Sequence, residues 1–240
     1  MANVKISEIN GGEDTTPAGN HLVEVEASSG TSYYIRLSNI SWLKVEDTWA
    51  YATATTITVP SGAASLYSVG DKVKLTQTTV KYFYIVGVAD TVLTVTGGSD
   101  YTVANAAITL PNYSKAASPV GFPDWFNDAV VVTGFSVDPT SMKNRFTIIG
   151  RTCEFVHFES AAGTSDQTFF TVALPVTAAS KAVAWIGTIW AVTNNGGDLN
   201  TGSVAVFSGG TVASLYTTHA GSAWAAANGK RARFQIRYEI

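Results

Sequence analysis

The chain has 240 residues, of which 46% are hydrophobic and only 14% are charged. This length allows one large or two small domains with cores of their own. The net charge is −3 and the fifteen lysines and arginines are scattered, so nucleic-acid binding is not expected. Membrane insertion is not expected either, because no run of about 18 apolar residues occurs.

The low charge content also bears on assembly. Gly, Thr, Ser, Ala and Val are abundant, a balance that is typical of all-β assembly proteins and unfavourable for helices. A large part of the surface must be uncharged, and a freely diffusing monomer tolerates such a surface poorly. We therefore expect buried contacts between subunits.

The single cysteine, Cys153, excludes an internal disulfide and a cysteine-ligated zinc site. We interpret it as a buried thiol in a strand. The first five residues lead into a polar segment rather than a signal peptide, so we expect a soluble protein made in a cytoplasm.

Residues 1–48 are predicted to contain a short apolar piece, a loop and a β-hairpin. The hairpin strands run from Leu22 to Val25 and from Tyr33 to Leu37, with Gly30 in the turn between them. The stretch from Ser38 to Asp47 is predicted to add one helical turn. An isolated hairpin is only marginally stable in water, so this segment is expected to pack on the next domain or on another chain.

Residues 49–126 are predicted to form a small antiparallel β-barrel. Apolar residues recur at every second position, which places their side chains on one face of a strand. The pairs are Ile57 and Val59, Val73 and Leu75, Phe83 and Ile85, and Leu93 and Val95. Turn residues such as Gly70-Asp71 and Gly97-Gly98 separate these runs at about ten-residue spacing, which favours a closed or nearly closed sheet.

Residues 127–144 are predicted to be a connector. The neighbouring Pro119 and Pro123, and Pro139 within the segment, disfavour a continuous strand or helix, although Val130 to Phe135 could still pair as a strand.

Residues 145–240 are predicted to form a second all-β domain of seven or eight strands, a sandwich of jelly-roll type. The clearest alternation closes the chain, with Phe234, Ile236 and Tyr238 inward and polar residues between them. The stretch from Val183 to Val192 is more hydrophobic, and its two-sided apolar character predicts burial on both faces.

No catalytic residue, metal ligand or cofactor site is expected. His21, His157 and His219 lie in different segments, and no pair has metal-ligand spacing. A structural role is favoured for His157. Acidic pairs such as Glu24/Glu26 and Asp124/Asp128 are compatible with glycosidase chemistry, but Glu24 and Glu26 are two apart on a strand and line one solvent face.

The aromatic residues near the C-terminus offer a candidate glycan contact. Tyr216, His219 and Trp224 occur together in a stretch rich in Gly, Ser and Ala, and an exposed Trp or Tyr can serve as a flat platform for a sugar ring. The competing interpretation is favoured, in which these aromatic side chains fill a core or a contact between subunits.

Three stretches resemble structural proteins of tailed bacteriophages. The first runs roughly from Thr53 to Phe126 and looks like a module of tail fibres and other virion appendages, through the ordered series GDK, KYFY, TVTGG, DYTVANA and GFP. The stretch from KISEI through HLVEVE to SSGTSYYIRLSNI resembles the attachment segment of phage fibres and head or tail appendages. GRTCEFVHFES and the closing ANGKRARFQIRYEI resemble the C-terminal β-sandwich of fibre and baseplate proteins, many of which are trimers.

The resemblance implies a non-enzymatic virion protein, a fibre or appendage component that docks through its N-terminal segment and exposes its C-terminal domain. It implies a homotrimer in contact with portal or neck, tail or capsid proteins, and host surface polysaccharide as a further candidate partner. The docking residues would be Val4, Ile6, Ile9, Tyr33, Ile35 and Leu37. Alternatives are a host-receptor (glycan) binding module of a tail fibre, a capsid decoration protein and, with least support, a polysaccharide-degrading enzyme.

Overall fold

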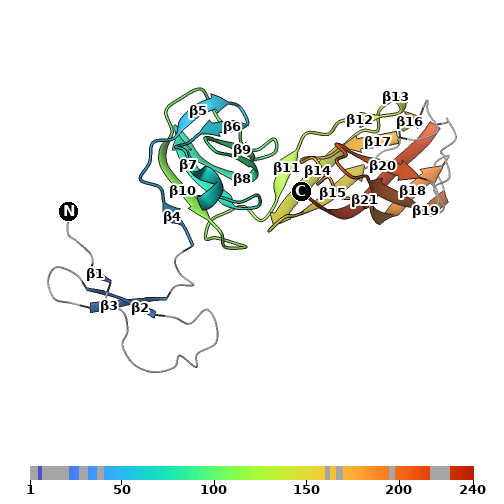
Figure 1. Cartoon of the computed structure of the whole chain (residues 1–240). Helices are drawn as coiled ribbons and strands as arrows, with labels where there is room; N and C mark the ends of the chain where they lie inside the picture. The colour runs from blue at the N-terminus through green and yellow to red at the C-terminus, as the bar shows by residue number, and fades with distance from the viewer. Residues whose placement is uncertain are drawn as a thin grey trace.

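The computed structural model describes residues 5–6, 22–26, 32–36, 41–159, 163–165, 170–194, 198–216 and 228–240. Within these ranges the chain is nearly all β, as the composition predicts, with three sheets and one short helix, α1 (Ala63–Leu66) (Figure 1). In the part of the chain that the structure describes, no helix is long and apolar enough to cross a membrane.

The first sheet has three antiparallel strands, β1 (Lys5–Ile6), β2 (Leu22–Glu26) and β3 (Ser32–Arg36), in the order β1-β2-β3. Its residues include Ile6, Tyr33 and Ile35, three of the predicted docking residues. The other three, Val4, Ile9 and Leu37, lie outside the described residues.

The second sheet, which we call the middle unit, has seven strands and curls around its own core (Figure 1). In spatial order they are β4 (Leu43–Lys44), β10 (Thr109–Ser114), β7 (Lys72–Gln77), β8 (Thr79–Ala89), β9 (Val92–Thr96), β6 (Thr56–Thr58) and β5 (Ala50–Thr53). The predicted alternation is present: Val73, Leu75 and Ile85 are each fully buried in one cluster. The predicted helical turn is wrong for residues 41–47, which carry strand β4, because Leu43 and Lys44 pair with Tyr113 and Asn112 of β10.

The third sheet, which we call the C-terminal unit, has eleven strands. Nine follow one path: β11 (Phe126–Asp128), β14 (Met142–Ile149), β15 (Thr152–Glu159), β21 (Asn228–Glu239), β18 (Trp185–Asn194), β19 (Asp198–Val206), β20 (Val212–Tyr216), β17 (Phe170–Ala173) and β12 (Val132–Thr133). Off this path, β13 (Phe135–Val137) pairs with β16 (Gly163–Ser165), and β16 pairs with β21.

The segment 127–144 is therefore not only a connector. It carries most of β11, all of β12 and β13, and the start of β14. Phe126 pairs with Phe146 across β11 and β14, and both side chains are fully buried, so burial of these rings stabilises pairing in this segment. The prolines act as expected, because Pro119, Pro123 and Pro139 all lie between strands.

In the C-terminal unit, two predictions about single strands can be compared with the structure. The closing strand alternates as predicted, with Phe234, Ile236 and Tyr238 buried. Burial of both faces of Val183 to Val192 is wrong for the described side chains: Val183 is 56% exposed and Ile186 is 75% exposed, whereas Ile189 is buried. One face of β18 therefore packs on the core and the other faces outward.

Candidate functional site at the junction of the two larger sheets

An aromatic cluster joins the middle and C-terminal units. Tyr84 of β8 and Phe122 of the loop between β10 and β11 lie in the same buried cluster as Phe126 and Phe146 of the C-terminal unit. The ring centroid of Tyr84 is 4.9 Å from that of Phe122 and 5.3 Å from that of Phe126, and Phe126 stacks on Phe146 at 5.8 Å. Pairs of this kind contribute roughly 0.5–1.5 kcal/mol each beyond the area they bury, so the cluster holds the units together.

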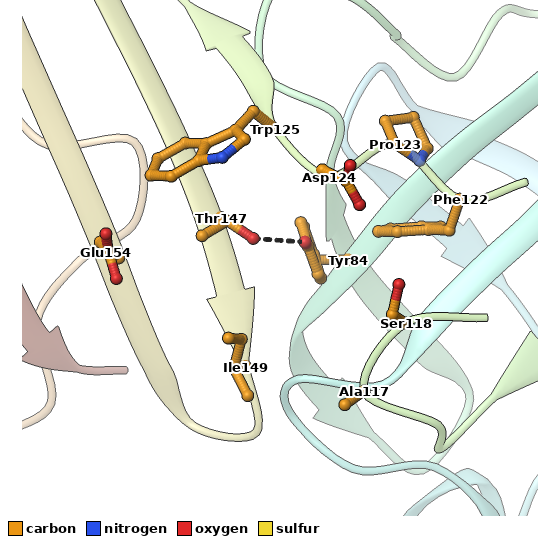
Figure 2. Close-up of a pocket in the computed structure, with 10 residues that line it drawn as sticks. All are labelled: Tyr84, Ala117, Ser118, Phe122, Pro123, Asp124, Trp125, Thr147, Ile149 and Glu154. Carbon is orange, nitrogen blue, oxygen red and sulfur yellow. Dashed lines mark hydrogen bonds between the residues drawn. The ribbon is translucent and has the colours of Figure 1, made fainter.

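Hydrogen bonds between the units reinforce this contact. The hydroxyl of Tyr84 lies 3.2 Å from Thr147 Oγ1, and burial raises the pKa of Tyr84, which keeps the phenol protonated (Figure 2). The Asp100 carboxylate accepts hydrogen bonds from the backbone N and the side-chain Nδ2 of Asn127, at 2.8 and 2.9 Å. The backbone N of Ser99 donates to the Asn127 carbonyl at 2.9 Å. We call this set of aromatic and polar contacts the joint.

Two glycines let the backbones of the units approach closely at the joint. A Cβ on Gly98 would lie 1.9 Å from the carbonyl oxygen of Asn127, and a Cβ on Gly70 would lie 1.7 Å from that of Gly150. Both glycines also have positive φ, +58° and +95°, which L residues with side chains adopt only at a cost. The chain can form these contacts only with glycine at both positions.

A pocket of about 270 Å³ opens beside the joint (Figure 2). Its walls come from both units and from the loop that links them. The lining residues are Tyr84, Ala117, Ser118, Phe122, Pro123, Asp124, Trp125, Thr147, Ile149 and Glu154. The pocket thus combines aromatic rings, hydroxyl groups and two carboxylates.

Of the two carboxylates that line the pocket, one is paired with an arginine and the other is not. The Glu154 carboxylate accepts a hydrogen bond from Arg237 Nε at 2.6 Å and contacts the side-chain amide of Gln235. The guanidinium of Arg145 lies 5.5 Å from the Trp125 ring centroid. Asp124 is exposed and accepts no hydrogen bond from the residues that the structure describes. Asp124 therefore remains available as an acceptor.

A second polar cluster lies in the core of the C-terminal unit. His157 Nδ1 is 2.6 Å from Asn144 Oδ1, and His157 Nε2 is 2.9 Å from Glu159 Oε1. Glu159 Oε2 also accepts the backbone N–H of Ala232 at 2.6 Å. Asn144, His157 and Glu159 are all at most 2% exposed. We call these three residues the histidine network. Both ring nitrogens of His157 lie within hydrogen-bond distance of a protein side chain.

The structure describes few of the residues on which sequence analysis placed chemistry. Tyr216 ends β20 and is half-buried, whereas His219 and Trp224 lie outside the described residues. No group of three or more His, Cys, Asp or Glu side chains suited to a metal occurs in the described ranges. Cys153 is a buried thiol in β15, as interpreted from the sequence, and burial raises its pKa to about 12.

Sequence analysis did not find the pocket or the histidine network. From the sequence, Asp124 is noted only as one member of an acidic pair, and Trp125 is not singled out. The available signal was their adjacency, directly after the turn residues Gly121-Phe122-Pro123. That signal places both residues in a linking loop, but it does not reveal which strand lies opposite.

Comparison with known proteins adds no assignment. No protein-family model matches the chain, and the searches of curated proteins and of solved structures gave no match.

Proposed function

We propose that this chain is a non-enzymatic structural protein of a tailed-phage virion, a fibre or appendage component made in the host cytoplasm and built into the particle. The observation that carries the proposal is the joint, supported by the resemblance of residues 53–126 to virion appendage modules. An appendage must hold its distal part in a defined direction. Buried rings, paired polar groups and glycine-mediated backbone contacts meet that requirement.

The finer features of the fold belong to the same proposal. Residues 1–48 would form an attachment hairpin, the middle unit a small barrel, and the C-terminal unit a jelly-roll sandwich exposed to solvent or host. Docking would use Val4, Ile6, Ile9, Tyr33, Ile35 and Leu37 against portal or neck, tail or capsid proteins. A homotrimer would bury the uncharged surface that the low charge content requires.

The test is incorporation into particles. In phage that encode the chain, deletion of residues 1–40 should give a soluble β-rich protein that is missing from purified particles, because the docking segment is gone. Circular dichroism of the purified truncation provides the folding control. Normal incorporation of the truncation, combined with loss of attachment on removal of residues 145–240, would reverse the proposed polarity.

The pocket beside the joint favours a second candidate function, binding of host glycan by the same appendage. Its Trp125 and Asp124 are residue types that bind sugars through ring stacking and hydroxyl recognition.

A further inference from the structure

We infer that the pocket beside the joint binds a neutral saccharide unit, with Trp125 as the platform for the sugar ring and Asp124 as the acceptor for its hydroxyl groups. The inference rests on the second candidate function and deepens it by naming the ligand class of the same pocket, which is a different site from the Tyr216, His219 and Trp224 set. It does not depend on the virion proposal, because sugar binding is measured on the purified protein and incorporation is measured on particles.

The size of the pocket limits the ligand. Its volume of about 270 Å³ lies slightly below the roughly 300–1,000 Å³ of pockets that accept drug-sized molecules. A single six-membered ring with its substituents fits a space of this size, whereas a nucleotide or a folded peptide does not.

The charge of the lining disfavours anionic ligands. Among the residues that the structure describes, the pocket wall contains the carboxylates of Asp124 and Glu154 and no lysine or arginine. A phosphate, sulfate or uronate group would meet two carboxylates, while the nearest guanidinium groups are already engaged: that of Arg237 with Glu154 and that of Arg145 with the Trp125 ring. The cost of desolvating that anion would not be recovered.

The surroundings also disfavour a cation. The Arg145 guanidinium already lies over one face of the Trp125 ring, at 5.5 Å from the ring centroid. The Glu154 carboxylate already forms an ion pair with Arg237 at 2.6 Å. A ligand ammonium would therefore be repelled by the Arg145 guanidinium and would find only Asp124 unpaired. A neutral ligand meets neither obstacle.

The polar groups match a ring with several hydroxyls. Asp124 offers acceptor oxygens, and Ser118 adds a hydroxyl at the exposed rim. The paired hydroxyls of Tyr84 and Thr147 retain further hydrogen-bonding capacity on the floor, because each hydroxyl can donate one bond and accept two (Figure 2). The half-buried ring of Trp125 supplies the flat apolar surface that the C–H face of a hexose requires.

The experiment uses the full chain and saturation-transfer NMR with the methyl glycosides of glucose, galactose and mannose. At least one should bind in the millimolar range. Asp124→Asn should bind about tenfold more weakly, since hydrogen bonds to charged groups contribute about 1.5–3 kcal/mol. Trp125→Ala should abolish the transfer signal. The matched control is Asp138→Asn, the same change at an exposed aspartate outside the pocket, and it should bind as the wild type does.

Results of two kinds would overturn the inference. One is absence of binding by all three glycosides, or binding that Asp124→Asn leaves unchanged. The other is binding of choline or of a methyl glucuronide with the same dependence on Asp124, because either would assign the pocket to a charged ligand. Asp124 is exposed and has no partner in the described residues, so its substitution tests binding even if Trp125→Ala fails to fold.

Discussion

At the scale of single residues, the histidine network shows how a buried polar cluster can be fully satisfied. Asn144 Nδ2 donates to the carbonyl of Ala129 at 3.1 Å, so Asn144 Oδ1 faces His157 and accepts the proton of Nδ1. His157 Nε2 and Glu159 then share one further proton. Two acceptor oxygens of Glu159 are used, one toward His157 and one toward Ala232 N–H.

We expect Glu159→Gln to change the free energy of unfolding by no more than about 1 kcal/mol, and Glu159→Ala to lower it by about 3–5 kcal/mol, the cost of breaking a buried polar pair. Glutamine can accept from Ala232 N–H and donate to a neutral His157, whereas alanine leaves both groups without partners. Urea unfolding of the two variants measures the difference. An equal loss of unfolding free energy in both variants would contradict the proposed hydrogen bonds of Glu159 to His157 and to Ala232 N–H.

Asp90 gives a pH-dependent contribution at a turn. Its carboxylate accepts hydrogen bonds from Ser61 Oγ at 2.7 Å and Gly62 N at 2.8 Å, and these bonds lower its pKa from the ordinary 3.8. The charged form is thus favoured in the folded state. The stabilisation is present above pH 3.8 and is lost as the pH falls through the lowered pKa.

We therefore expect Asp90→Asn to be less stable than wild type at neutral pH, and the difference to shrink progressively below pH 3.8. Thermal melts across this pH range provide the measurement. Asp138→Asn, at an exposed aspartate away from this turn, is the control. A difference that stayed constant down to the lowest pH would assign the effect to the altered turn rather than to the charge.

At the scale of elements, the joint depends on the close approach of β11 to the turn after β9. Gly98→Ala combines a positive φ with a clash of 1.9 Å against the Asn127 carbonyl. Gly62→Ala is the matched control, because Gly62 has φ +95° but its nearest neighbouring atom lies 3.9 Å away.

We expect Gly62→Ala to cost about 1–2 kcal/mol for the left-handed conformation alone, and Gly98→Ala to cost clearly more. Urea unfolding gives both values. Small-angle scattering should also show a longer particle for Gly98→Ala, because the units separate when the backbones cannot approach. Equal costs and equal dimensions for the two variants would mean that the joint does not need this contact.

At the scale of the whole molecule, the chain leaves two large apolar side chains exposed beside the paired strands β18 and β19. Ile186 is 75% exposed and Phe207 is 49% exposed. Ile186 pairs with Ala205 of β19, and Phe207 directly follows that strand, so the two exposed side chains lie near the same end of this strand pair. A second copy of the chain could cover this surface.

We expect the protein to be a trimer, with a mass in light scattering about three times the 25.3 kDa of the chain. Ile186→Lys should lower that mass, since it places a charge in the apolar contact at little cost to the single chain. Val120→Lys is the control, because Val120 is equally exposed, at 77%, and lies outside the sheet. A wild-type protein that stayed monomeric at micromolar concentration would contradict the prediction.

The sequence by itself determined the all-β character and many inward-facing positions. Val73, Leu75 and Phe83 are buried where the two-residue period placed them, and so are the alternate residues from Phe234 to Ile240. The reason is local: the pleat sends successive side chains to opposite faces, so a few consecutive residues contain the whole signal.

Only the tertiary structure decided which of these residues meet. His157 gains Glu159 from its own strand but Asn144 from β14 and Ala232 from β21, and the pocket brings Asp124 and Trp125 to Thr147. Strand pairing within 127–144 also depended on Phe146, which lies beyond the segment. These contacts depend on how strands that are distant in the chain are aligned with one another. The two-residue period of a single strand does not contain that alignment.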